Sequence, residues 1–137
     1  MPKWTYYLTI YNQLDRPLKL SAENIAWGKK ESSKDYPGNF PSQIDPGTSG
    51  KFYVYSPAAR SYGIEFYLTF NDIAPAGQNM YGTMQIDVDM PYWKHRNTSS
   101  CTTTGLLSQS GFQYVPDGAH DFSTSVTVSR SVNATKK

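Results

Sequence analysis

The segment from Asp89 to Asn97 holds the densest group of side chains that could do chemistry. Pro91 should end a strand there, because proline cannot donate a hydrogen bond to a neighbouring strand. Two amphipathic rings follow, with three side chains that are or can become cationic: Tyr92, Trp93, Lys94, His95 and Arg96. Tyr and Trp rings favour the membrane–water interface, and Lys and Arg pair with phosphate oxygens. The segment predicts a loop that contacts lipid headgroups; the alternative is that Trp93 packs into the core with the cations in solvent.

Two further loops carry rings that can be exposed. Tyr36 opens a Tyr-Pro-Gly-Asn-Phe stretch, and Tyr81 closes an Ala-Gly-Gln-Asn-Met-Tyr stretch. The same features fit a second kind of ligand, because ring faces stack on sugars and amide groups hydrogen-bond sugar hydroxyls. Composition does not separate a lipid headgroup from a glycan, so a glycan-binding lectin is the alternative function.

Enzyme and metal chemistry have less support. Asp87 and Asp89 share one face of an expected strand, about 7 Å apart, and with His120 they could bind a metal. Cys101 and His95 could form a nucleophilic pair. Solvated polar faces and a structural thiol are the simpler interpretations, and neither a nucleophile elbow nor a phosphate-binding loop is present. We predict no enzyme activity, no metal and no cofactor.

Composition and charge narrow the classes of protein further. The 137 residues predict a single domain, 1–137, with a frayed tail at 132–137. Lys and Arg number 13 against 11 Asp and Glu, so the net charge of +2 argues against nucleic-acid binding. Cys101 is the single cysteine, which excludes an intramolecular disulfide. Residues 1–4 lack the apolar region of a signal peptide, and we expect a protein secreted or released by another route.

The dominant period of the sequence is two, which predicts strands. Ile64, Phe66 and Leu68 alternate with polar neighbours, as a half-buried strand requires. The segments with this character or with strong β propensity are 4–11, 18–27, 51–55, 63–70, 83–89 and 122–129. Residues 28–46 and 71–82, rich in Pro and Gly, predict loops. Short strands separated by turns predict an all-β protein, a single-domain antiparallel β-sandwich.

The chain also resembles the aegerolysins, small β-sandwich proteins of fungi and bacteria. The resemblance is carried by short elements, among them a Trp-led run of strand formers, a Trp-Gly-Lys element and an Asp-x-Pro-aromatic element: Lys3–Asn12, Ile25–Lys29, Pro46–Val54, Ala59–Ser61, Gly63–Asp72 and Met84–Asn97. The Asp-x-Pro-aromatic element after a strand is also similar to that of the actinoporins. The resemblance implies a sandwich with aegerolysin- or actinoporin-like topology.

What the resemblance implies for function is recognition of membrane lipids, often sphingolipids together with sterol. Family members of this kind recruit a larger pore-forming partner protein, and bacterial ones act in binary insecticidal toxins. We therefore expect the lipid-binding component of a cytolytic toxin, which acts at a target-cell membrane and lies on the bilayer. The residues expected to contact lipid, from the loops and from the resemblance, are Trp4, Trp27, Tyr36, Tyr81, Tyr92, Trp93, Lys94 and Arg96.

Overall fold

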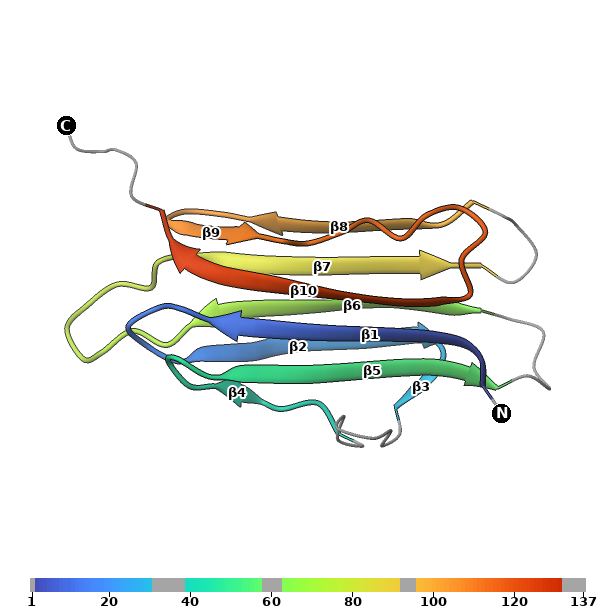
Figure 1. Ribbon diagram of the computed structural model, residues 1–137. Helices are drawn as coiled ribbons and strands as arrows, with labels where there is room; N and C mark the ends of the chain where they lie inside the picture. Colours follow the sequence, from blue (N-terminus) through green and yellow to red (C-terminus); the bar gives the residue numbers. More distant parts are fainter. Residues whose placement is uncertain (1, 31–38, 58–62, 92–95, 132–137) are drawn as a thin grey trace.

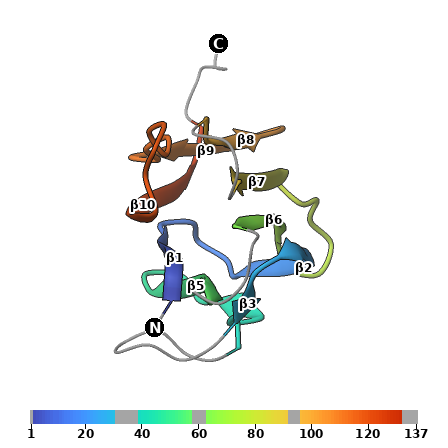
Figure 2. The ribbon, with the colours of Figure 1, turned by 90° about the vertical axis from the view of Figure 1, so that its right-hand side faces the viewer.

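The computed structural model describes residues 2–30, 39–57, 63–91 and 96–131, which form two five-stranded sheets packed face to face (Figure 1). The described residues contain no helix long and apolar enough to cross a membrane. Sheet A holds, in spatial order, β3 (Lys29–Lys30), β5 (Ser49–Pro57), β1 (Pro2–Asn12), β10 (Asp121–Arg130) and β9 (Leu107–Ser110). Sheet B holds β4 (Gln43–Ile44), β2 (Leu18–Trp27), β6 (Ile64–Asp72), β7 (Thr83–Met90) and β8 (Thr98–Thr103). Figure 2, viewed along the strands, shows the two layers separately.

The sequence prediction of strands is confirmed for the six longer ones. The first and last residues of each predicted segment lie within two residues of the ends of the observed strand, in β1, β2, β5, β6, β7 and β10. The prediction of one loop over residues 28–46 is wrong, because β3 and β4 lie there. Strands of two residues have no internal period, and these two form because β5 and β2 offer edges to pair with. The strands β8 and β9 were also not predicted, since their Ser and Thr residues do not alternate with apolar ones.

Sheet A contains one departure from an antiparallel sandwich. Among the described strands, β1 and β10 pair in parallel, with Thr5 opposite Asp121 and Asn12 opposite Val128, whereas the other pairings are antiparallel. The first and last strands of the fold thus lie side by side at the middle of sheet A (Figure 1). A strand pattern does not predict which distant strand becomes a neighbour.

The core lies between the two sheets and follows the predicted alternation. On β6 the side chains of Ile64, Phe66, Leu68 and Phe70 are buried, and their neighbours Glu65 and Tyr67 are exposed. Inward residues of sheet A complete the core, including Tyr6, Leu8, Ile10, Phe52, Val126 and Val128. Burial of each large apolar side chain contributes about 1.5–3 kcal/mol relative to exposure. This packing makes the sandwich a rigid support for its end loops.

Tyr6 is the one polar side chain at the centre of that core whose hydroxyl has no hydrogen-bond partner among the described residues. Burial raises the pKa of this phenol well above its ordinary value. Replacing Tyr6 by Phe should therefore leave the free energy of unfolding unchanged or raise it by about 1 kcal/mol, since no buried hydrogen bond is lost. Urea denaturation measures this. Tyr114→Phe, at an exposed ring, serves as the control. A marked loss of stability in Tyr6→Phe would mean that an ordered water satisfies the hydroxyl.

Candidate functional site

One end of the sandwich gathers most of the described segments that the sequence analysis singled out. β2 ends there at Trp27, opposite Glu65, and β7 ends at Met90, opposite Ile64. In sheet A, β10 begins at the same end, where Asp121 pairs with Thr5. We call this end of the molecule, on the right in Figure 1, the Trp27 end. Residues from five strands of both sheets, β1, β2, β6, β7 and β10, thus lie at one end of the molecule.

Trp27 is held at this end by the backbone that follows it. The register of β2 against β6 shifts between Ile25 and Trp27, and Gly28 then adopts a φ of 118°. A Cβ atom at Gly28 would lie only 2.9 Å from Cγ1 of Val54, so the chain needs glycine to pass from sheet B into sheet A. The Trp27 side chain is 49% exposed, which is unusual for so large a ring. The ring is accessible from outside the sandwich, and its expected contact with lipid stays a prediction.

The connection between β7 and β8 returns to the sandwich through Asn97. The backbone N–H of Asn97 donates to Oδ1 of Asp117 at 2.9 Å. Its side-chain amide donates to the carbonyl oxygens of Pro116 at 2.8 Å and Ala119 at 3.0 Å. Asn97 is buried and joins two loops of the Trp27 end, a role that sequence analysis missed because an isolated Asn carries no periodic signal.

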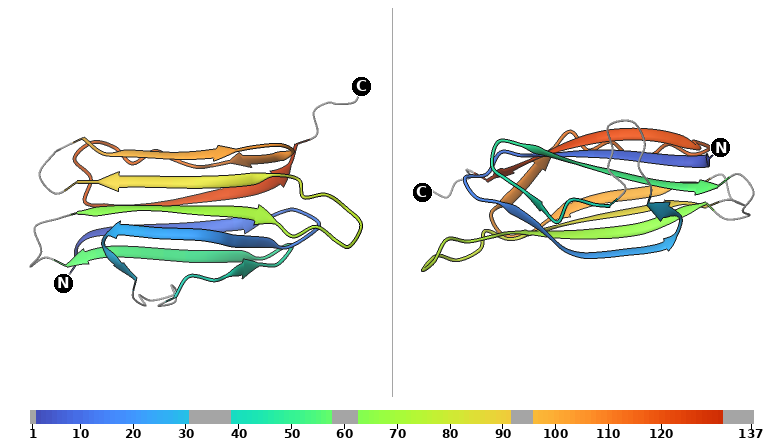
Figure 3. Two further views of the ribbon diagram at one scale, coloured as in Figure 1. Left: turned by 180° about the vertical axis from the view of Figure 1, so that it is seen from behind. Right: turned by 90° about the horizontal axis from the view of Figure 1, so that it is seen from below.

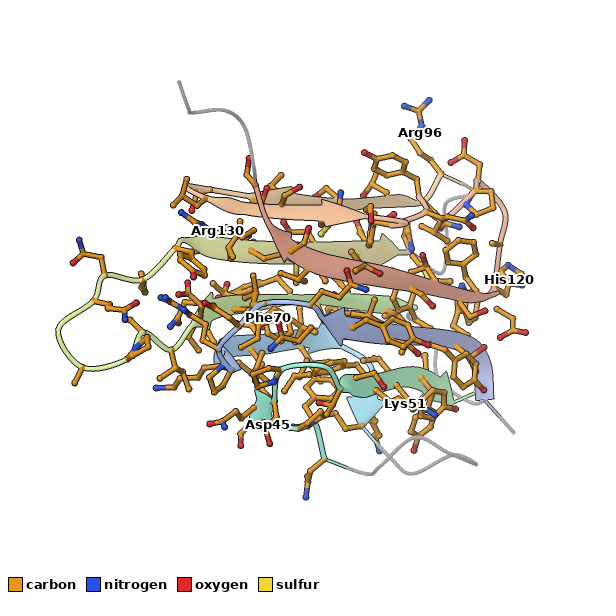
Figure 4. All side chains as sticks on the ribbon, turned by 60° about the vertical axis from the view of Figure 1, so that its left-hand side comes forward. Asp45, Lys51, Phe70, Arg96, His120 and Arg130 are labelled. Atoms are coloured by element: carbon orange, nitrogen blue, oxygen red, sulfur yellow. The ribbon has the colours of Figure 1, made fainter. Side chains whose placement is uncertain are left out.

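Arg96 precedes this anchor and is exposed, projecting from the same end as His120 in Figure 4. The predicted residues Tyr92, Trp93 and Lys94 lie outside the described residues, as does Tyr36. Lys29, the residue after Gly28, is also exposed. The described part of the Trp27 end thus presents an indole ring together with cationic side chains.

The expectation that Trp4 contacts lipid is wrong for this structure. Trp4 is 3% exposed and belongs to the core, with its ring centroid 4.6 Å from that of His120. Its strand, β1, is the middle strand of sheet A, and alternate residues of that strand point between the sheets. A residue at the start of a strand looks terminal in the sequence, but here Trp4 is buried and the ring of His120 packs against it.

Tyr81 is also misplaced by the sequence prediction, because it lies at the opposite end, which we call the Tyr81 end. The guanidinium carbon of Arg16 lies 3.6 Å from the centroid of the Tyr81 ring, and that of Arg130 lies 5.1 Å from it. The Tyr81 hydroxyl donates to Asp15 at 2.9 Å, and this hydrogen bond lowers the pKa of the Asp15 carboxyl. Figure 4 shows Arg130 far from Arg96. Tyr81 therefore cannot act together with Trp27.

Below Tyr81 a buried ion pair holds the loop between β6 and β7. The Arg16 Nη1 atom donates to Oδ2 of Asp72 at 3.2 Å, and both side chains are buried. The same carboxylate accepts the backbone N–H groups of Tyr81 at 2.8 Å and Gly82 at 3.0 Å. Arg16 also donates to the carbonyl oxygen of Asn79 at 3.0 Å. Both oxygens of the Asp72 carboxylate therefore accept hydrogen bonds, and these contacts give the Tyr81 end a structural role.

The metal alternative has no geometric support in the described part of the chain. No three His, Cys, Asp or Glu side chains of the described residues gather closely enough to hold a metal ion. Asp87 and Asp89 do share a face of β7, as predicted, but His120 packs against Trp4 on another part of the molecule. Of the histidines, His95 lies outside the described residues.

Cys101 is partly buried in β8, and burial raises the pKa of its thiol to about 12. Thiolate at pH 8 is then only about 10⁻⁴ of the total, whereas an unfolded chain with a pKa near 8.5 has about a quarter. We predict slow reaction of native Cys101 with iodoacetamide at pH 8, faster reaction as the pH rises towards 12, and rapid reaction in urea. Mass spectrometry of timed samples measures it. Rapid alkylation of the native protein would contradict the raised pKa.

Comparison with known proteins gives likeness in structure only. No protein-family model matches the sequence, and no curated protein matches it. IP-1A from Alcaligenes faecalis is similar with a TM-score of 0.69 and 19% identity, over 93% of this chain and 91% of that one. RahU protein, solved with a TRIS molecule, has a TM-score of 0.58 and 15% identity, over 93% and 97%.

The lipid-binding protein Nakanori is also similar, with a TM-score of 0.58 and 10% identity, over 93% of this chain and 71% of that one. Identities this low concern the fold and leave the ligand open. Together with the strand order described above, they show that this chain has the aegerolysin-like β-sandwich fold that the resemblance in sequence implies.

Proposed function

We propose that this protein binds membrane lipids through the Trp27 end. The observation that carries the proposal is the half-exposed indole of Trp27 at a rigid end of the sandwich, where exposed Arg96 also lies. An indole ring has an apolar body and an N–H donor, so the membrane–water interface suits it better than bulk water. Nakanori, which shares the fold, is described as a lipid-binding protein.

The physical mechanism is docking of preformed groups at the bilayer surface. An indole that enters the headgroup region contributes about 1.5–3 kcal/mol from its buried area, and the Arg96 guanidinium at the same end of the sandwich engages phosphate with two donors. One or two such groups give reversible binding, which becomes stronger when several copies act together. A net charge of +2 is too small for bulk anionic attraction to dominate. The headgroup therefore decides which membrane is bound.

The finer part of the proposal is that the lipid is a sphingolipid, with sterol beside it in the membrane. It also holds that the protein is released from its cell, lies on the target membrane, and recruits a larger pore-forming partner. This part is supported by the resemblance in sequence at Ile25–Lys29 and Met84–Asn97.

A vesicle panel tests the lipid. Sphingomyelin with cholesterol, ceramide phosphoethanolamine with cholesterol, and phosphatidylcholine with cholesterol are compared by co-sedimentation, with a fourth set that contains phosphatidylserine. We expect the sphingolipid vesicles to retain the protein and phosphatidylserine to add little. Equal binding to all four sets, or binding to none, contradicts the proposal.

Dye release from the same vesicles tests the partner. We expect the chain alone to bind sphingolipid vesicles without releasing dye, because the described part of the protein is a closed, well-packed sandwich. Release of dye by this protein alone would contradict the requirement for a partner while leaving lipid binding intact.

A further inference from the structure

A groove crosses the outer face of sheet B, the face turned towards the viewer in the left view of Figure 3. Its volume is about 430 Å³, which is within the range of small-ligand sites. β2, β6, β7 and β8 all contribute to it, so its floor is the pleated sheet itself. Its principal polar and aromatic lining side chains are Asn24, Glu65, Tyr67, Asp87, Asp89 and Ser100.

Strand register arranges these side chains in two rows across the sheet. In the first row, Asn24 pairs with Tyr67, Tyr67 with Asp87, and Asp87 with Ser100. In the second row, Glu65 pairs with Asp89, and Asp89 with Thr98. Directly opposed side chains in such pairs have Cβ atoms about 4.5–5.5 Å apart. Each row therefore presents closely spaced polar groups on one surface.

Tyr67 supplies the flat apolar surface in the first row. Its side chain is 40% exposed, although it lies in the middle of the sheet with strands on both sides. Asp87 beside it is oriented by two contacts from the Gln85 amide, at 3.1 and 3.2 Å. An exposed ring next to an oriented carboxylate offers a stacking surface and a fixed hydrogen-bond acceptor within one groove.

We infer that this groove is a second binding site, for an uncharged sugar residue of a glycan. A sugar has an apolar C–H face that stacks on a ring, and hydroxyls that both donate and accept hydrogen bonds. The carboxylates accept such hydroxyls, while Asn24, Thr98 and Ser100 carry groups that also donate. Among the described lining residues Glu65, Asp87 and Asp89 are acidic and none is Lys or Arg, so this part of the groove disfavours sialylated or sulfated sugars by charge repulsion.

An alkylammonium group is the other ligand that carboxylates and a Tyr ring attract. An alkylammonium nitrogen accepts no hydrogen bond, so it leaves the donor groups of Asn24, Thr98 and Ser100 unused. The mixed donors and acceptors of the groove thus favour the sugar. This inference uses other side chains than the lipid proposal: the groove extends to Glu65, which lies opposite Trp27, but its lining does not include Trp27.

The test is a glycan array of neutral, sialylated and sulfated glycans, followed by nuclear magnetic resonance titration with methyl glycosides of glucose, galactose, mannose and N-acetylglucosamine. We expect neutral glycans to bind, and the winning glycoside to shift the amide signals of β6 and β7. Tyr67→Ala should weaken binding about tenfold, as loss of a ring contact does. Tyr114→Ala, at an exposed ring outside the groove, should bind normally.

Asp87→Asn provides a conservative second variant that keeps the shape of the side chain, and it should also weaken binding. The source of the sugar is tested with glucosylceramide in phosphatidylcholine vesicles: inhibition by free methyl glycoside supports the site for a lipid-borne sugar too. Binding of choline or ethanolamine without any sugar overturns the inference, as does full binding by Tyr67→Ala. Retained binding of Tyr67→Ala to sphingomyelin vesicles separates this outcome from the lipid proposal.

Discussion

Replacement of Asp72 by Ala should lower the free energy of unfolding by about 3 kcal/mol, the largest loss of stability that we expect from one polar side chain. Asp72 is 1% exposed and accepts hydrogen bonds from Arg16 and from two backbone N–H groups. The variant leaves a buried guanidinium without its carboxylate. We expect a loss of stability near the smallest found for buried ion pairs, because Asp72 lies near one end of the sandwich. Urea denaturation of both proteins measures the difference.

Asp15→Ala is a matched control, since it removes another carboxylate from the same arginine. The Asp15 side chain is exposed, and its contact with Arg16 Nε is 3.2 Å long. Solvent screens such a pair, so the variant should lose much less stability than Asp72→Ala. If the two variants lose the same amount, the buried pair does not hold the loop between β6 and β7, and the interpretation of the Tyr81 end is wrong.

Trp27→Ala should reduce affinity for sphingolipid vesicles by about 10- to 100-fold, the largest effect on function that we expect. The variant removes the indole that enters the headgroup region and leaves the sandwich intact, because Trp27 is half exposed and outside the core. Co-sedimentation over a range of lipid concentrations measures the affinity. Thermal denaturation verifies that the variant is folded.

Tyr11→Ala is the matched control for this second prediction. Tyr11 is 46% exposed, close to the 49% of Trp27. It lies near the last residue of β1, at the end of the sandwich opposite to the Trp27 end. We expect this variant to bind vesicles as the unaltered protein does. Equal losses in both variants would show that exposed rings bind lipid without regard to position, and an unchanged Trp27→Ala would remove the main support for the proposed function.

The two ends of the molecule differ in how their aromatic rings are used. At the Tyr81 end, cations lie over the Tyr81 ring and a carboxylate accepts its hydroxyl, so its polar and aromatic capacity is met within the protein. At the Trp27 end, half of the Trp27 ring faces outward. The exposed fraction of the side chain thus identifies Trp27 as the candidate binding ring. Residue type does not.

The sequence by itself determined the class of fold and the direction in which most strand side chains point. Alternation along Ile64–Phe70 is a local property, because successive side chains of a strand leave opposite faces of the sheet. It therefore holds wherever the strand is placed. The two-residue strands β3 and β4 have no such pattern, and they exist because other strands present edges to them.

Only the tertiary structure decided which of the ringed residues share a surface. Trp4 packs against His120, which is distant in the sequence, and Tyr81 lies at the end opposite to Trp27. The two rows of side chains that contain Glu65, Tyr67 and Asp87 likewise depend on the register between strands. These placements follow from contacts between distant segments, whose free energies depend on the whole packing arrangement. No window of neighbouring residues contains that information.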